Sequence, residues 1–105
     1  MVKSLHQGVD LELRSVLYRE GNFHLAHCLE LDLVGEGATP REALDTLVEL
    51  VECHVATAIE DGDLASIFRP APAELWRLYS LGQPRRGRKT KSPVTRFELR
   101  EWVMN

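Results

Sequence analysis

TPREAL, residues 39–44, begins the amphipathic run that decides the fold of this chain. Thr39 can cap a helix with its hydroxyl, and Pro40 suits the first helical position because its missing N–H would be unpaired there. The Glu42 carboxylate can reach back to the Thr39 N–H and complete a capping box. Because Gly62 is a typical residue for a helix end, the sequence predicts one long helix from Thr39 up to this glycine.

The apolar residues of this run recur at helical spacing and form one stripe, whereas most of its charged residues lie off that stripe. The stripe consists of Leu44, Leu47, Val48, Val51, Val55, Ala58 and Ile59. The charged positions are Arg41, Asp45, Glu49, Glu52 and Glu60. A helix with this pattern needs an apolar surface to pack on, and we expect the preceding segments to supply it.

Three segments before the helix predict strands. Residues 9–20 alternate apolar and polar side chains, Gly21 marks a turn, and residues 23–29 predict an antiparallel second strand. Residues 31–36 predict a third strand, although residues 29–33 are also compatible with one bent strand. Three antiparallel strands followed by a long helix predict an α+β fold of β-β-β-α order, with the helix covering one sheet face.

The segments after the helix predict a connection, a second helix and a last strand. Residues 64–69 are apolar enough to pack on the core, and residues 73–81 predict a short helix because prolines precede them and a glycine follows. Residues 94–103 alternate again and predict a C-terminal strand. The chain is accordingly divided into an α+β domain (1–82), a basic linker (83–93) and a C-terminal strand segment (94–105).

Charge is distributed unevenly along the chain. Residues 1–82 carry six Lys/Arg and fourteen Asp/Glu, a net charge of −8, whereas residues 83–105 carry seven and two, a net charge of +5. The linker contains no apolar residue, and we expect its basic side chains to contact nucleic acid or an acidic partner. These candidates are Arg85, Arg86, Arg88, Lys89 and Lys91. The alternative is a solvated tail without a partner.

The C-terminal strand segment also bears on self-association. It follows a linker that is long enough to reach its own sheet or a neighbouring chain, and Trp102 interrupts its alternation. Because sheet edges tend to be covered, we expect a dimer or larger oligomer in which residues 94–105 are swapped or lie at the contact.

Length and composition favour one small domain in the cytoplasm. A chain of 105 residues can bury one modest core. No apolar run approaches the roughly 20 residues of a membrane span. Residues 1–8 lack the apolar core of a signal peptide, and the two cysteines are compatible with a reducing compartment.

Two groups of residues raise the alternative of metal-dependent chemistry. Asp10 and Glu12 share one strand face, as do Glu30 and Asp32, and four such carboxylates could hold Mg²⁺ for a nuclease. No nucleophile, basic clamp or phosphate-binding glycine loop accompanies them, so a solvated acidic face is the preferred interpretation.

The second group has the residue types of a zinc site. It comprises His24, His27, Cys28, Cys53 and His54. Adjacent residues on a strand point to opposite faces, and adjacent residues on a helix lie about 100° apart, so few of these side chains can converge. We therefore expect a buried structural cysteine, surface histidines, no metal, no cofactor and no enzymatic activity.

Two stretches, FHLAHCLELDLV (residues 23–34) and GATPREAL (residues 37–44), resemble the HicB-like antitoxin family. The similarity covers about residues 9–72, and its most specific part is the glycine-x-threonine, two-residue, glutamate-alanine-leucine signature at the helix start. The resemblance implies a partial, catalytically silent ribonuclease-H-like fold: a three-stranded sheet, a long helix and often a further strand. Ala38 departs from the acidic residue usual at its position. Only 23 residues follow Gly82, so the DNA-binding domain of many members is not expected.

The resemblance also implies a function. HicB-like proteins commonly neutralise HicA-type toxins, small ribonucleases that cleave messenger RNA, and many act as dimers or tetramers, so the resemblance implies self-association as a dimer or tetramer. An acidic protein can steer to the positive surface of such a toxin and block it. The candidate contact residues are Glu30, Asp32, Glu49 and Glu52. The alternative is a stand-alone structural or regulatory oligomer of the same fold with no toxin partner.

Overall fold

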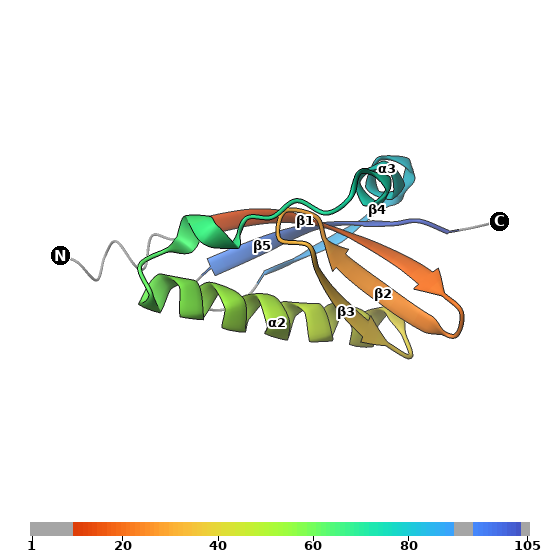
Figure 1. Cartoon of the computed structure of the whole chain (residues 1–105). Helices are drawn as coiled ribbons and strands as arrows, with labels where there is room; N and C mark the ends of the chain where they lie inside the picture. Colours follow the sequence, from red (N-terminus) through yellow and green to blue (C-terminus); the bar gives the residue numbers. More distant parts are fainter. Residues whose placement is uncertain (1–9, 90–93, 104–105) are drawn as a thin grey trace.

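The computed structural model describes residues 10–89 and 94–103 and has an α+β architecture around a five-stranded mixed sheet (Figure 1). The strands are β1 (Asp10–Glu20), β2 (Phe23–Cys28), β3 (Leu33–Gly37), β4 (Gln83–Lys89) and β5 (Val94–Glu101). Their order in the sheet is β3-β2-β1-β5-β4. β1 and β5 are parallel, and the other three neighbouring pairs are antiparallel. The helices are α2 (Pro40–Glu60), the 3₁₀ helix η1 (Leu64–Ile67) and α3 (Ala73–Leu81).

Helix α2 confirms the long helix that the sequence predicts. The Thr39 hydroxyl accepts a hydrogen bond from the Glu42 N–H at 3.1 Å, as the cap requires. The Glu42 carboxylate accepts from the Ala38 N–H at 3.0 Å rather than from that of Thr39, so the reciprocal bond of the capping box falls one residue earlier than predicted. At the other end Gly62 has φ +70°, a backbone conformation that glycine adopts without strain.

Thr39→Ala is expected to lower the free energy of unfolding by about 0.5 to 2 kcal/mol, because it removes the acceptor of the Glu42 N–H. Chemical denaturation followed by circular dichroism measures this loss. Thr57→Ala is the matched control, since Thr57 is exposed within the same helix and alanine is a better helix former. Equal midpoints for the two variants would show that Thr39 does not stabilise the helix start.

The main core lies between α2 and one face of the sheet. Strands β1, β2 and β5 contribute Leu13, Leu17, Ala26, Cys28, Phe97 and Leu99 to it. The helix contributes Ala43, Leu44, Leu47, Val51, Val55 and Ala58, most of the apolar stripe expected from the sequence. Helix α2 approaches β3 most closely at two glycines: a Cβ atom on Gly35 would lie 2.4 Å from the Ala43 carbonyl oxygen, and one on Gly37 would lie 2.5 Å from the Glu42 Cβ. These glycines let α2 lie directly on the edge strand.

Helix α3 packs on the opposite face of the sheet (Figure 1). A second, smaller cluster there buries Val16, Leu29, Ala71 and Leu75. The Trp76 indole N–H donates to the Ala71 carbonyl at 3.2 Å, which fastens α3 to the segment that precedes it. The sequence prediction of a short helix over residues 73–81 is confirmed, and Ile67 in η1 is buried, as a connection packed on the core should be.

One prediction about the C-terminal part is corrected by the structure. Residues 83–89, expected as linker, form strand β4, because they pair antiparallel with β5. Residues 90–93 lie outside the described residues. Strand β5 lies between β1 and β4 of the same chain, so both of its edges are paired there.

The connection between β2 and β3 is also sharper than expected. It is a turn over residues 29–32 in which Asp32 has φ 55°, and β3 begins only at Leu33. The Leu29 N–H donates to the Arg14 carbonyl at 2.8 Å, so the turn is bound to β1. The alternative of one bent strand over residues 29–33 is therefore wrong. The β-β-β-α order is confirmed, whereas the sheet has five strands rather than three and one further strand.

Candidate functional site

The outward face of α2 carries a row of carboxylates that we call the acidic ridge. Its members are Glu42, Asp45, Glu49, Glu52 and Glu60. They recur on the side of the helix opposite the apolar stripe, as helical periodicity predicts for Glu49 and Glu52. Glu49 and Glu60 are exposed and Glu52 is half-exposed. Because the ridge belongs to a helix packed along the core, the backbone positions of its members are fixed relative to one another.

Some members of the acidic ridge form hydrogen bonds or ion pairs with other residues of the chain, and others do not. Glu42 accepts the Ala38 N–H at the helix start. Asp45 accepts a hydrogen bond from Arg88 Nη2 at 2.9 Å, which joins α2 to β4. Across residues 10–89 and 94–103, no group forms an ion pair or hydrogen bond with the side chains of the remaining three. These free carboxylates are those of Glu49, Glu52 and Glu60.

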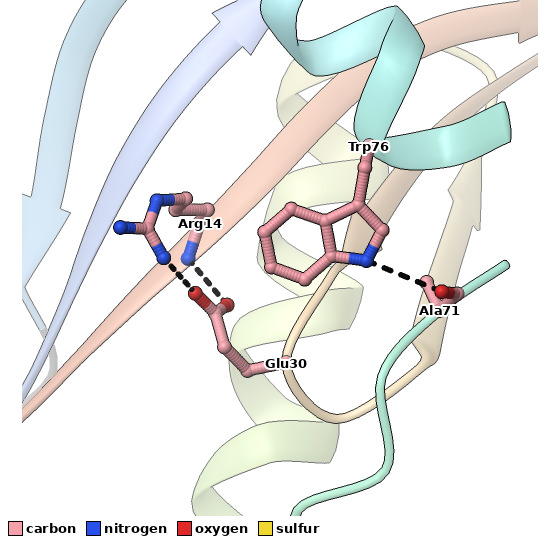
Figure 2. A network of polar contacts seen from close by, with 4 residues as sticks. All are labelled: Arg14, Glu30, Ala71 and Trp76. Atoms are coloured by element: carbon pink, nitrogen blue, oxygen red, sulfur yellow. Dashed lines mark hydrogen bonds and ion pairs between the residues drawn. The ribbon is translucent and has the colours of Figure 1, made fainter. Parts of the chain in front are cut away.

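Glu30 does not belong to the acidic ridge, and its carboxylate binds Arg14 of the same chain. Its Oε1 accepts from the Arg14 backbone N–H and its Oε2 from Arg14 Nη1, both at 2.7 Å (Figure 2). The Arg14 guanidinium lies 5.9 Å from the centre of the Trp76 ring, which belongs to α3. Glu30 therefore lies on the α3 side of the sheet and helps to hold the β2–β3 turn against β1, away from the acidic ridge.

Asp32 also has a partner within the chain. Asp32 Oδ1 and His27 Nε2 are 2.7 Å apart, and His27 Nδ1 is 3.4 Å from the Tyr18 hydroxyl. Burial, with smaller contributions from Glu20, Asp32 and Glu74, raises the pKa of Tyr18. Sequence reasoning thus placed four acidic residues in one partner-binding set, but only Glu49 and Glu52 lie on the acidic ridge.

A second charged surface, which we call the arginine groove, lies between the start of α2 and β4. It encloses about 480 Å³ and is lined by Leu17, Thr39, Pro40, Arg41, Leu44, Arg85, Arg86, Gly87, Arg88 and Leu99. Arg85 is paired with Glu101 and Arg88 with Asp45. Arg41 and Arg86 are exposed and have no ion pair with any residue that the structure describes.

The groove brings three of the five basic candidates together and adds one that the sequence did not single out. Lys89 is placed as the last residue of β4, and Lys91 lies outside the described residues. Arg41 joins Arg85, Arg86 and Arg88 because β4 runs beside the start of α2. The sequence did not indicate Arg41 as a candidate, because the residues at the start of a helix carry no sign of which strand lies beside them in the fold.

The residues considered for metal binding do not converge. Glu12 Oε2 lies 3.6 Å from Arg96 Nη1, and the Glu30 carboxylate is bound to Arg14. Asp10 is the first residue of β1. Cys28 is buried in the main core, whereas Cys53 is exposed on α2. Burial raises the pKa of the Cys28 thiol to about 12. Within residues 10–89 and 94–103, no group of three or more His, Cys, Asp or Glu residues is placed to hold a metal ion.

No helix in the described part of the chain combines the length and the apolar character that crossing a membrane requires. Comparison of the chain with protein-family models, with curated proteins and with solved structures found no match in any of the three.

Proposed function

We propose that this chain is an antitoxin-type binding protein that neutralises a HicA-type, messenger-RNA-cleaving toxin through the acidic ridge of α2. One observation carries the proposal: Glu49, Glu52 and Glu60 are free carboxylates on one packed helix. The arrangement of three antiparallel strands, a long helix and a further strand added to the sheet supports the partial ribonuclease-H-like fold that the resemblance implies.

The physical basis is electrostatic complementarity. A ribonuclease needs positive surface to hold phosphates, and a fixed row of carboxylates attracts that surface from about one Debye length, about 10 Å at 0.1 M salt. Free carboxylates lose no internal ion pair when a partner binds them, unlike Asp45 and Glu30. The toxin contact is therefore assigned to Glu49, Glu52 and Glu60, and Glu30 and Asp32 are assigned to the turn that they stabilise.

The double variant Glu49→Lys/Glu52→Lys is expected to slow association with the toxin by about tenfold or more, because electrostatic steering raises association rates by orders of magnitude. Binding kinetics at several salt concentrations measure this, and the intact protein should show the steeper salt dependence. Co-expression with a HicA-type toxin from the same genome gives the cellular readout: the intact protein relieves growth arrest, and the variant does so less well. Thermal unfolding should be nearly unchanged, since neither side chain has an internal partner.

Glu20→Lys/Glu98→Lys is the matched control, because it changes the net charge equally at two exposed positions outside α2. Equal slowing by both double variants would show that total charge, and not the acidic ridge, governs association. If the intact protein binds no HicA-type toxin at micromolar concentration, the antitoxin role is excluded. The alternative, a stand-alone regulatory oligomer of this fold, then takes its place.

A further inference from the structure

The two edges of the sheet are built differently. The β4 edge carries four basic residues within its seven, begins with Gln83-Pro84, and shifts register between Arg85 and Arg88. Charged side chains, proline and bulges are the features with which natural sheets prevent pairing with another chain. The β4 edge is therefore protected against strand addition.

The β3 edge has few of these features. Its sequence, LVGEG, contains no proline and no basic residue, and its register with β2 is regular from Leu33 to Gly37. Val34 is 42% exposed, and Glu36 is the only charged residue of the strand. Such an edge presents backbone N–H and C=O groups to any strand of suitable shape.

The flank of α2 above this edge is also free of charge. Leu50 follows Ala43 by seven residues and Leu47 by three, so it lies on the side of the helix that rests on Gly35. Leu50 is 43% exposed. Its exposed neighbours on this flank are Thr46, Cys53, His54 and Thr57. The flank has no Asp, Glu, Lys or Arg, in contrast to the acidic ridge on the outward face of the same helix.

We propose that two copies of this chain associate through β3, pairing antiparallel about a two-fold axis near Gly35. In this register Val34 lies opposite Glu36 of the second copy, and no like charges face each other. The two five-stranded sheets become one continuous sheet. Both α2 helices then lie on the same face of that sheet, antiparallel to each other, with the first halves of their uncharged flanks, around Thr46 and Leu50, in contact.

The spacing of the elements fits this arrangement. Paired strands lie about 4.8 Å apart. Helix α2 packs on β3 and, less extensively, on β2, so its axis lies between these two strands. Pairing of two β3 strands then places the helix axes between about one and three strand spacings apart, about 5 to 14 Å, a range that includes the 8–10 Å at which helices pack. The same arrangement of the two copies therefore allows both the pairing of the β3 strands and the packing of the α2 helices.

A second copy fits this surface better than another partner does, because a two-fold contact requires a surface that can face itself. The uncharged flank satisfies that condition, and the acidic ridge and the basic β4 edge do not. The contact also leaves the acidic ridge and the arginine groove accessible. It places self-association on β3, whereas the sequence had suggested residues 94–105.

Analytical ultracentrifugation tests the proposal on the full chain. The intact protein is expected to be a dimer at tens of micromolar. Leu50→Glu and Val34→Glu, each placing a charge in the contact at an exposed position, should weaken the dimer about 100-fold or more, because Val34→Glu faces Glu36 of the second copy and like charges brought together are costly. Leu81→Glu is the matched control, since Leu81 is 61% exposed on α3 and should leave the dimer intact. Circular dichroism should show the same fold for all four proteins.

Crosslinking gives a second measurement that does not depend on destabilising the contact. In a Cys53→Ser background, Thr46→Cys should form a disulfide-linked dimer on oxidation, because Thr46 lies near the proposed axis. Ala56→Cys, exposed on the outward face of α2, should not. A monomeric intact protein, a dimer that both charged variants leave unchanged, or equal crosslinking by the two cysteine variants would each overturn the proposal.

Discussion

Gly35→Ala is expected to lower the free energy of unfolding by about 3 kcal/mol, one of the largest effects available to a single methyl group in this protein. The added Cβ would lie 2.4 Å from the Ala43 carbonyl oxygen and 2.5 Å from the Leu47 backbone nitrogen. Both atoms belong to the backbone of α2, so no side-chain rotation relieves the overlap. The helix has to move away from β3 and loses its contact with the core.

Urea unfolding of Gly35→Ala measures this effect, and Gly21→Ala is the control. Gly21 has φ +61°, and a Cβ there would meet nothing within 4 Å, so its cost of about 1 to 2 kcal/mol is that of the left-handed backbone alone. If Gly35→Ala were no more destabilising than Gly21→Ala, α2 would not rest on β3 as described. The inferred spacing of helices in the dimer would then be wrong as well.

Phe97→Ala is expected to cost about 3 to 5 kcal/mol, the range for truncating a fully buried phenylalanine. Phe97 is 0% exposed and lies in the main core between β5 and α2. The cavity is enclosed by a helix on one side and the sheet on the other, so the site cannot collapse easily. The change therefore measures how far the C-terminal strand belongs to the fold.

Phe23→Ala removes the same atoms from a side chain that is 52% exposed, and it should cost clearly less, about 1 kcal/mol. Comparable losses in the two variants would mean that β5 does not complete its own sheet. The expected difference also bears on residues 83–105 as a whole. They had been interpreted as a linker and a strand segment separate from the domain, but removing them would take Phe97 and Leu99 out of the core.

The sequence predicted the elements whose side chains carry a periodic signal. Helix α2 combines a threonine cap, a proline at the first position, a long apolar stripe and a glycine at its end, so several independent features agree. Strand β5 and the first half of β1 alternate apolar and polar residues because one face is buried in the main core, whereas Val16 of β1 is buried on the opposite face, in the second cluster. The bounds of α3 follow equally well from the prolines before it and Gly82 after it.

Strand β4 carries no such signal. Each described side chain of Gln83–Arg88 is exposed or half-exposed, and the strand contains no apolar residue except Pro84. It forms because β5 offers it a hydrogen-bonding edge, and that edge exists only once β5 has paired with β1. Pairing of this kind is a tertiary effect that local propensity does not contain.

The residues of the candidate site also differ in how far the sequence alone predicts their place. Helical periodicity is sufficient to predict that Glu49 and Glu52 face outward, and their exposure confirms it. The ion pair of Glu30 with Arg14 joins residues sixteen positions apart, and it depends on how the β2–β3 turn meets β1. Sequence spacing alone could not distinguish a carboxylate bound in this way from a free one.

The parallel pairing of β1 with β5 has a kinetic consequence. Asp10 is paired with Val94 and Leu17 with Glu101, so β1 acquires its second neighbour from the far end of the chain. Contacts of such long sequence separation slow folding, because the intervening loop must be closed before any pairing compensates its entropy. During synthesis, β1 keeps one open edge until β5 has been made. That interval is when the nascent protein is most exposed to misassembly with other chains.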